Sequence, residues 1–142
     1  MIRIIALLCS LSIFAAPFTT VATFGVAESK KLFETTRLVA TGNKSTNYAK
    51  LRMPQEDYLK VLPFISKIII YTQKGEGIGG GIHYTAAREF IDKPNITDIV
   101  AIVSGDSDGA GWRYWYVIQF KNGDSYTSPA QGRWYSSSDG WY

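Results

Sequence analysis

The sequence predicts a mainly β fold: a single antiparallel domain, sandwich-like or barrel-like, with at most one or two short helices, after an N-terminal signal peptide. Two observations carry this prediction. Residues 112–120 (WRYWYVIQF) alternate strictly between an apolar face and a mixed face, which is the period-two pattern of a half-buried strand. Residues 121–124 (KNGD) then place Asn122 and Gly123 between two β-prone runs, a strong signal for a type I′ hairpin turn.

The N-terminus has the pattern of a secretory signal peptide over residues 1–22. Arg3 supplies the positive charge, a short apolar region follows, and small residues offer cleavage after Ala22 or as late as Ala27. The apolar region has roughly 13 residues, whereas a transmembrane helix needs roughly 20. We therefore expect a secreted, extracellular protein whose single β-rich domain occupies residues 28–142.

Composition excludes several classes of function. The single cysteine, Cys9, lies inside the predicted signal peptide, so a disulfide framework, thiolate metal ligands and a cysteine nucleophile are all excluded from the mature domain. Without Arg3 the chain keeps 14 basic residues against 12 acidic ones, a net charge near +2, and the basic residues are scattered along the sequence. We therefore expect no nucleic-acid partner.

The other elements follow from shorter patterns, and about five to seven strands are expected in all. A first strand is expected over residues 35–40, and residues 66–73 (SKIIIYTQ) predict a stronger one. Residues 54–62 suit either a short helical turn or strand and loop, and Pro63 ends either one. Residues 84–91 suit either two helical turns or a continued strand.

The run at residues 96–103 (ITDIVAIV) predicts a central strand. Only Thr97 and Asp98 are polar, and the apolar residues fall on both faces of an extended chain, as in a strand covered on two sides. This run also affects the two N-glycosylation candidates, Asn43 and Asn95, which each begin an N-x-S/T sequon. Because Asn95 starts a strand that we expect to be buried, Asn43 is the favoured site.

A glycine-rich segment matches the spacing of a dinucleotide-binding loop at Gly75, Gly77 and Gly80. That motif needs a helix that opens at the last glycine and points its amide groups at pyrophosphate. Residues 81–84 (GIHY) are instead typical of extended chain. We therefore expect a flexible loop and no bound cofactor.

Asp106 and Asp108 resemble the start of a calcium-binding loop, because carboxylates two residues apart can reach one cation. The full pattern also needs an oxygen ligand where Ala110 stands and a glutamate where Val117 stands. The loop lacks both, so no metal site is expected.

Few residues are suited to catalysis. His83 is the only histidine, and no H-E-x-x-H motif occurs, whereas hydrolase triads and zinc sites usually need one well-placed histidine or several. We therefore expect no enzyme, with a carboxylate-dependent hydrolase as the further alternative. The acidic residues available for such a hydrolase are Glu89, Asp92, Asp98, Asp106 and Asp108.

Aromatic residues are concentrated near the C-terminus. Such side chains give large contact areas at low entropic cost and are favoured at binding surfaces. Trp115 lies beside Arg113 on the mixed face of its strand, so both are predicted binding residues, together with Trp134 and Tyr135 in the tail. The aromatic residues expected to fill the core instead are Trp112, Tyr114 and Tyr116.

Five short blocks occur in the order found in a known family. They are residues 36–42 (TRLVATG), 66–71 (SKIIIY), 96–99 (ITDI), 106–111 (DSDGAG) and 117–121 (VIQFK). In these blocks the chain resembles multiprotein bridging factor two, a small insect secreted family whose members are often labelled salivary secreted peptides. The chain has WRYW at residues 112–115 where that family has Gly-Gly-Val-Gly. The resemblance implies a single-domain secreted β protein of poorly defined role.

Taken together, these patterns predict a secreted, non-enzymatic binding or effector protein that recognises carbohydrate, a host protein or a microbial surface. The surplus of Trp and Tyr without a catalytic constellation is the observation behind it. The alternative is a membrane-active protein, either pore-forming or antimicrobial. The expected partners are therefore carbohydrate or an extracellular protein, with a membrane as the alternative.

Overall fold

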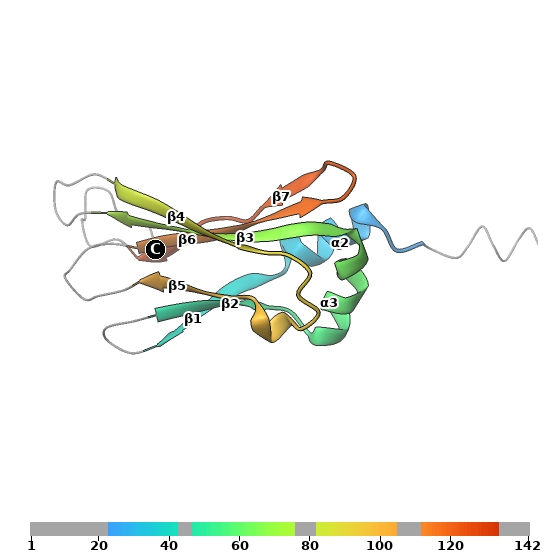
Figure 1. Ribbon diagram of the computed structural model, residues 1–142, viewed down its shortest axis with the longest axis horizontal. Coiled ribbons are helices and arrows are strands. Elements are labelled where there is room, and N and C mark those ends of the chain that lie inside the picture. The colour runs from blue at the N-terminus through green and yellow to red at the C-terminus, as the bar shows by residue number, and fades with distance from the viewer. Residues whose placement is uncertain (1–22, 43–46, 76–81, 105–111, 134–142) are drawn as a thin grey trace, which may run out of the picture.

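The computed structural model describes residues 23–42, 47–75, 82–104 and 112–133. Two antiparallel sheets lie face to face as two layers and do not close into a barrel (Figure 1). The predicted mainly β, antiparallel, sandwich-like fold is therefore confirmed, and the barrel-like alternative is wrong. Within the described ranges, no helix has the length and apolar character needed to cross a membrane.

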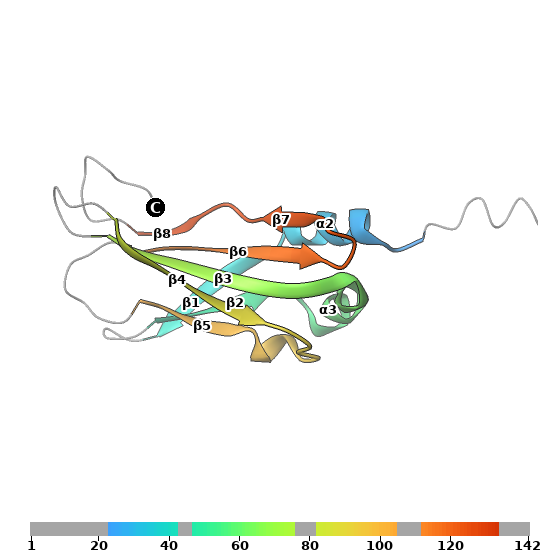
Figure 2. The same cartoon turned by 45° about the horizontal axis from the view of Figure 1, so that its top comes forward.

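The smaller sheet has three strands in the order β1-β2-β5, and the larger sheet has five. The strands of the smaller sheet are β1 (Arg37–Gly42), β2 (Asn47–Arg52) and β5 (Val100–Ser104). The strands of the larger sheet are β3 (Ile65–Gly75), β4 (Ile82–Phe90), β6 (Trp112–Phe120), β7 (Ser125–Thr127) and β8 (Gln131–Arg133). The larger sheet runs β4-β3-β6-β7, and β8 also pairs with β6 (Figure 2).

Among the described residues, two α-helices and two short 3-10 turns accompany the sheets. The helices are α2 (Val26–Glu34) and α3 (Gln55–Val61), and the 3-10 turns are η1 (Leu62–Phe64) and η2 (Ile96–Asp98). Both helices lie at the same end of the two layers (Figures 1 and 2). The predicted strands at residues 66–73 and 112–120 are confirmed, the helical alternative holds for residues 54–62, and the strand alternative holds for residues 84–91.

The prediction of one central strand over residues 96–103 is wrong. Ile96–Asp98 forms η2, and β5 starts at Val100 and lies at the edge of the smaller sheet, where β2 is its one partner among the described strands. One face of β5 is buried, but Ile102 on the other face is 53% exposed. The apolar residues on both faces of this run therefore did not indicate a strand buried on both faces. The larger sheet packs against only one face of β5.

The hairpin between β6 and β7 is confirmed, but its predicted type I′ turn is wrong. That turn needs positive φ at both central residues, whereas only Gly123 has positive φ (94°) and Asn122 does not. Gly123 N donates to Phe120 O (3.1 Å) and Phe120 N donates to Asp124 O (2.9 Å), which closes a three-residue loop instead. A left-handed glycine at the end of such a loop is the common arrangement.

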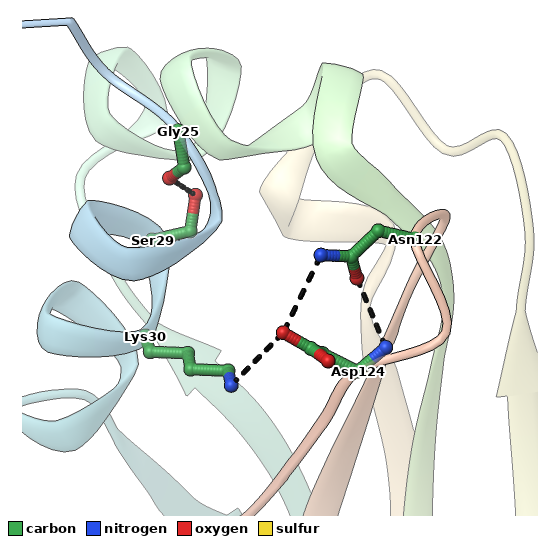
Figure 3. Close-up of polar contacts among 5 residues, drawn as sticks. All are labelled: Gly25, Ser29, Lys30, Asn122 and Asp124. Atoms are coloured by element: carbon green, nitrogen blue, oxygen red, sulfur yellow. Dashed lines mark hydrogen bonds and ion pairs between the residues drawn. The ribbon is translucent and has the colours of Figure 1, made fainter.

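Helix α2 was not predicted, because it is only nine residues long and begins beside the predicted signal peptide. Its start is capped: Gly25 N donates to Glu28 Oε1 (2.9 Å) and Ser29 Oγ donates to Gly25 O (2.8 Å). Lys30 Nζ then contacts Asp124 Oδ2 (3.2 Å) in the β6–β7 loop, where Asn122 also binds Asp124 (Figure 3). Of the two predicted cleavage points, only the one after Ala22 leaves this capped helix intact.

The core lies between the inner faces of the two sheets and continues under α2 and α3. Phe33 of α2 is fully buried against the rings of Tyr116 and Phe120. The Tyr116 hydroxyl lies 2.7 Å from Phe33 O and 2.8 Å from Thr36 O, and its one hydrogen donates to either carbonyl. Burial raises the pKa of the Tyr116 hydroxyl above its ordinary value, so it stays neutral and available as a donor.

Candidate functional site

The outer face of the larger sheet brings together two of the predicted binding residues. We call it the aromatic face, and it consists of Lys67, Ile69, Tyr71 and Gln73 on β3, Thr85, Ala87 and Glu89 on β4, and Arg113, Trp115, Val117 and Gln119 on β6. These residues alternate along their strands with core residues such as Ile68 and Tyr116, which point into the sandwich. The β pleat therefore places them on the side away from the core.

A pair of stacked rings occupies the centre of the aromatic face. Tyr71 and Trp115 are directly opposite each other on β3 and β6, with ring centroids 5.3 Å apart and planes 12° apart. Each ring covers one face of the other. Ile69, on the same side of the sheet, is only 4% exposed although it lies outside the core cluster. The aromatic face therefore has an ordered apolar surface of its own.

A chain of polar contacts runs beside the stacked rings. Arg113 Nε and Nη2 donate to Gln73 Oε1 at 3.2 and 3.0 Å, and Gln73 Nε2 donates to Thr85 Oγ1 at 3.2 Å. The Arg113 guanidinium carbon is also 5.8 Å from the centroid of the Trp115 ring, within range of a cation–π interaction. These contacts orient a guanidinium, an amide and a hydroxyl along one edge of the ring pair.

The β4 side of the ring pair is less crowded. Ala87, which is exposed, lies directly opposite Tyr71 on the side away from Trp115. Directly opposite Tyr71, β4 therefore contributes only the methyl group of Ala87. Two residues along β4, Glu89 Oε1 forms an ion pair with Lys67 Nζ at 2.9 Å. A ligand that packs against the Tyr71 ring here would meet polar groups at both ends.

The predicted binding residues therefore have different outcomes. Arg113 and Trp115 lie together on the aromatic face, whereas Trp134 and Tyr135 lie outside the described residues. Tyr71 and Gln73 were not among the predicted binding residues. The alternation of residues 66–73 did place both on one face of a strand, but nothing in the sequence indicated that this strand pairs with β6.

Of the aromatic residues expected in the core, only Tyr116 is fully buried. Tyr114 is partly buried and packs against the core cluster. Trp112 is half-buried, and the Lys74 ammonium lies 5.4 Å from the centroid of its ring. The core prediction is thus confirmed for Tyr116 and holds in part for Tyr114.

The candidate hydrolase residues that the structure describes lie on three different segments: β4, the loop after it and η2. Glu89 pairs with Lys67, Asp92 is exposed with a φ of 52°, and Asp98 lies in η2 near Tyr58, whose pKa is raised by burial and then by this carboxylate. Asp106 and Asp108 fall outside the described residues. Among the residues that the structure describes, no three His, Cys, Asp or Glu side chains are placed to hold a metal ion.

The two glycosylation candidates also differ. Asn95 lies in an exposed stretch immediately before η2, and it is the next residue, Ile96, that is buried. The expectation that burial disfavours Asn95 is therefore wrong, because this segment is not part of a strand. Asn43 lies outside the described residues.

Comparison with protein-family models and with curated proteins finds no match to this chain. The resemblance to the insect secreted family stays a prediction.

Proposed function

We propose that the protein is a secreted, non-enzymatic binding protein that recognises carbohydrate through the aromatic face. The stacked pair Tyr71–Trp115, on the side of the sheet away from the core, is the observation that carries this proposal. The face of an aromatic ring carries partial negative charge and attracts the C–H groups on one side of a sugar ring. Arg113 and Gln73 stand beside the rings, where they can bind sugar hydroxyls.

The polar groups of this face suit a sugar because hydroxyl groups both donate and accept hydrogen bonds. Arg113 supplies donors, Glu89 supplies acceptor oxygens, and the second N–H of the Gln73 amide supplies a further donor. The ion pair between Lys67 and Glu89 is neutral as a unit. These features favour an uncharged glycan over a strongly anionic one. A few well-placed polar groups around an apolar surface are the usual composition of a ligand site.

The first test is binding of the purified protein to immobilised chitin, cellulose, mannan and bacterial peptidoglycan. We expect at least one of these to bind, and we expect Trp115→Ala to weaken that binding by about thirtyfold, the effect of losing a central aromatic contact. Tyr48→Ala is the matched control, because it removes an exposed tyrosine from the other sheet. A protein that binds no glycan on the panel would contradict the proposal.

A second variant separates binding from folding. Ala87→Leu places a bulky side chain next to the Tyr71 ring without removing either ring, and Ala87 is exposed, so the fold should tolerate it. We expect a loss of glycan binding similar to that of Trp115→Ala with an unchanged melting temperature. Unaltered binding in both variants, with both proteins folded, would exclude the aromatic face as the site.

A further inference from the structure

The outer face of the smaller sheet has a different chemistry. We call it the basic face, and it consists of Arg37, Val39 and Thr41 on β1, Tyr48, Lys50 and Arg52 on β2, and Val100 and Ile102 on β5. These residues alternate with Leu38, Ala49, Leu51 and Ala101, which point into the core. All three of its charged residues are basic, and all three are exposed.

Strand register sorts this face into a charged end and an apolar end. Arg37 is directly opposite Arg52 at one end, and Tyr48 is directly opposite Ile102 at the other. Lys50 lies between these two rows. Because a strand rises about 3.3 Å per residue, the two rows are roughly 13 Å apart. The cations and the exposed apolar side chains therefore lie at different positions along the strands of the same face.

The cations of the basic face have no partner of opposite charge within the described ranges. No carboxylate stands on this face, and none of the described ion pairs includes Arg37, Lys50 or Arg52. Like charges directly opposite each other destabilise a pair of strands. An anionic surface outside the molecule would relieve that repulsion, so charge complementarity points to an anionic partner.

The apolar end indicates what kind of anionic partner fits. Tyr48 is 43% exposed and Ile102 is 53% exposed, and they form one cross-strand pair. Close by, a hollow of about 410 Å³ is lined by Lys50 and Arg52 together with apolar residues that include Val39 and Met53. A partner that offers only charge, such as a sulfated polysaccharide, would leave Tyr48 and Ile102 in water. A second copy of this chain would be repelled by its own cations.

We propose that the basic face docks on the surface of an anionic lipid bilayer. Tyr48 and Ile102 enter the interfacial region, where amphipathic and apolar side chains are favoured, while Arg37, Lys50 and Arg52 pair with the lipid phosphates. This is peripheral docking on a membrane surface and is independent of glycan binding by the aromatic face.

The test is co-sedimentation of the protein with vesicles of phosphatidylcholine alone and of phosphatidylcholine mixed with phosphatidylglycerol. We expect binding to the anionic vesicles only, and weaker binding as salt is added. Each basic residue near an anionic membrane contributes about fivefold in affinity, so the triple variant Arg37→Gln, Lys50→Gln, Arg52→Gln should bind about a hundredfold more weakly. Absence of binding to anionic vesicles would overturn the proposal.

A matched control removes the same charge elsewhere. The triple variant Lys31→Gln, Lys93→Gln, Lys121→Gln loses three exposed lysines from α2 and from two loops. It should keep most of its affinity if the basic face is the site, and should match the first triple variant if only net charge matters. The latter result would refute the inference.

A final pair of variants tests the apolar contact. Tyr48→Ser with Ile102→Ser should weaken vesicle binding by about tenfold or more, because both side chains lose their apolar surface. Unchanged vesicle binding in this variant, together with complete competition by soluble heparin, would assign the face to anionic polysaccharide instead of lipid. Loss of vesicle binding in any of these variants should leave glycan binding intact, so the two proposals can fail separately.

Discussion

The two outer faces of this sandwich are built from the same alternation of side chains and yet differ in how their charges are satisfied. On the aromatic face, Arg113 is held by Gln73, and Lys67 is paired with Glu89. On the basic face, Arg37 stands opposite Arg52, with no carboxylate among the residues of the face. A face with internally satisfied polar groups suits a neutral ligand, whereas an unbalanced one suits a charged surface.

The comparison assumes that stability comes from the inner faces of the sheets and binding from the outer ones. The most direct test of this assumption is to substitute one tyrosine on the inner face and one on the outer face of the larger sheet. Tyr116→Phe removes the buried hydroxyl that donates to Phe33 O or Thr36 O, and should lower the free energy of unfolding by about 1–3 kcal/mol. Tyr71→Phe, on the aromatic face, should change it by less than about 0.5 kcal/mol. Urea denaturation measures both.

The same residue predicts a pH dependence. The pKa of Tyr116 is raised in the folded protein by burial and then by Tyr126, relative to its ordinary value of 10.0. Its contribution to stability is therefore complete below pH 10 and is lost as the pH rises toward the folded-state pKa. Tyr116→Phe should make the fall in stability above pH 10 less steep. Equal slopes in the two proteins would contradict this assignment.

Substitutions on the aromatic face should have a smaller effect on the free energy of unfolding than Tyr116→Phe. Because Tyr71 and Trp115 stack on each other, a double-mutant cycle of Tyr71→Ala and Trp115→Ala should give a coupling energy of about 1 kcal/mol in stability. Val117, on the same face as Trp115 but not part of the stack, provides the control cycle, with Tyr71→Ala and Val117→Ala. Coupling near zero in the first cycle would mean that the rings do not stack in solution.

The basic face should show the smallest effect and the opposite sign. Arg52→Gln removes the like-charge pair with Arg37 and should raise the free energy of unfolding by about 0.5 kcal/mol at low ionic strength. The gain should disappear in high salt, which screens the repulsion. Lys93→Gln, in an exposed loop, is the control and should show neither effect. A loss of stability in Arg52→Gln would mean that the arginine is already satisfied within the fold.

Local sequence patterns predicted those parts of the fold that depend on neighbouring residues. The alternation of residues 112–120 gave the limits of β6, and Asn122-Gly123 marked the hairpin. The edge position of β5 was not predictable in this way, because an apolar run does not reveal how many sheets will cover it. Helix α2 was missed because it is only nine residues long and depends on the burial of Phe33 and on a cap at Gly25.

The candidate sites were less predictable than the strands. Arg113 and Trp115 share a strand, so the sequence analysis found them together, but Tyr71 and Gln73 join them only through pairing of β3 with β6. The basic face depends on the register of β1 with β2, which brings Arg37 and Arg52 together across 15 positions of chain. The basic residues are scattered along the sequence, as predicted, but the fold brings Arg37, Lys50 and Arg52 together on one face.

The central claim is that the two outer faces bind different partners, and one reciprocal measurement tests it. Trp115→Ala and the triple variant Arg37→Gln, Lys50→Gln, Arg52→Gln are each compared with the unaltered protein for binding to the glycan panel and to anionic vesicles. The account predicts that Trp115→Ala loses only the glycan and that the triple variant loses only the vesicles. Loss of both activities in either folded variant, or of neither in both, would contradict it.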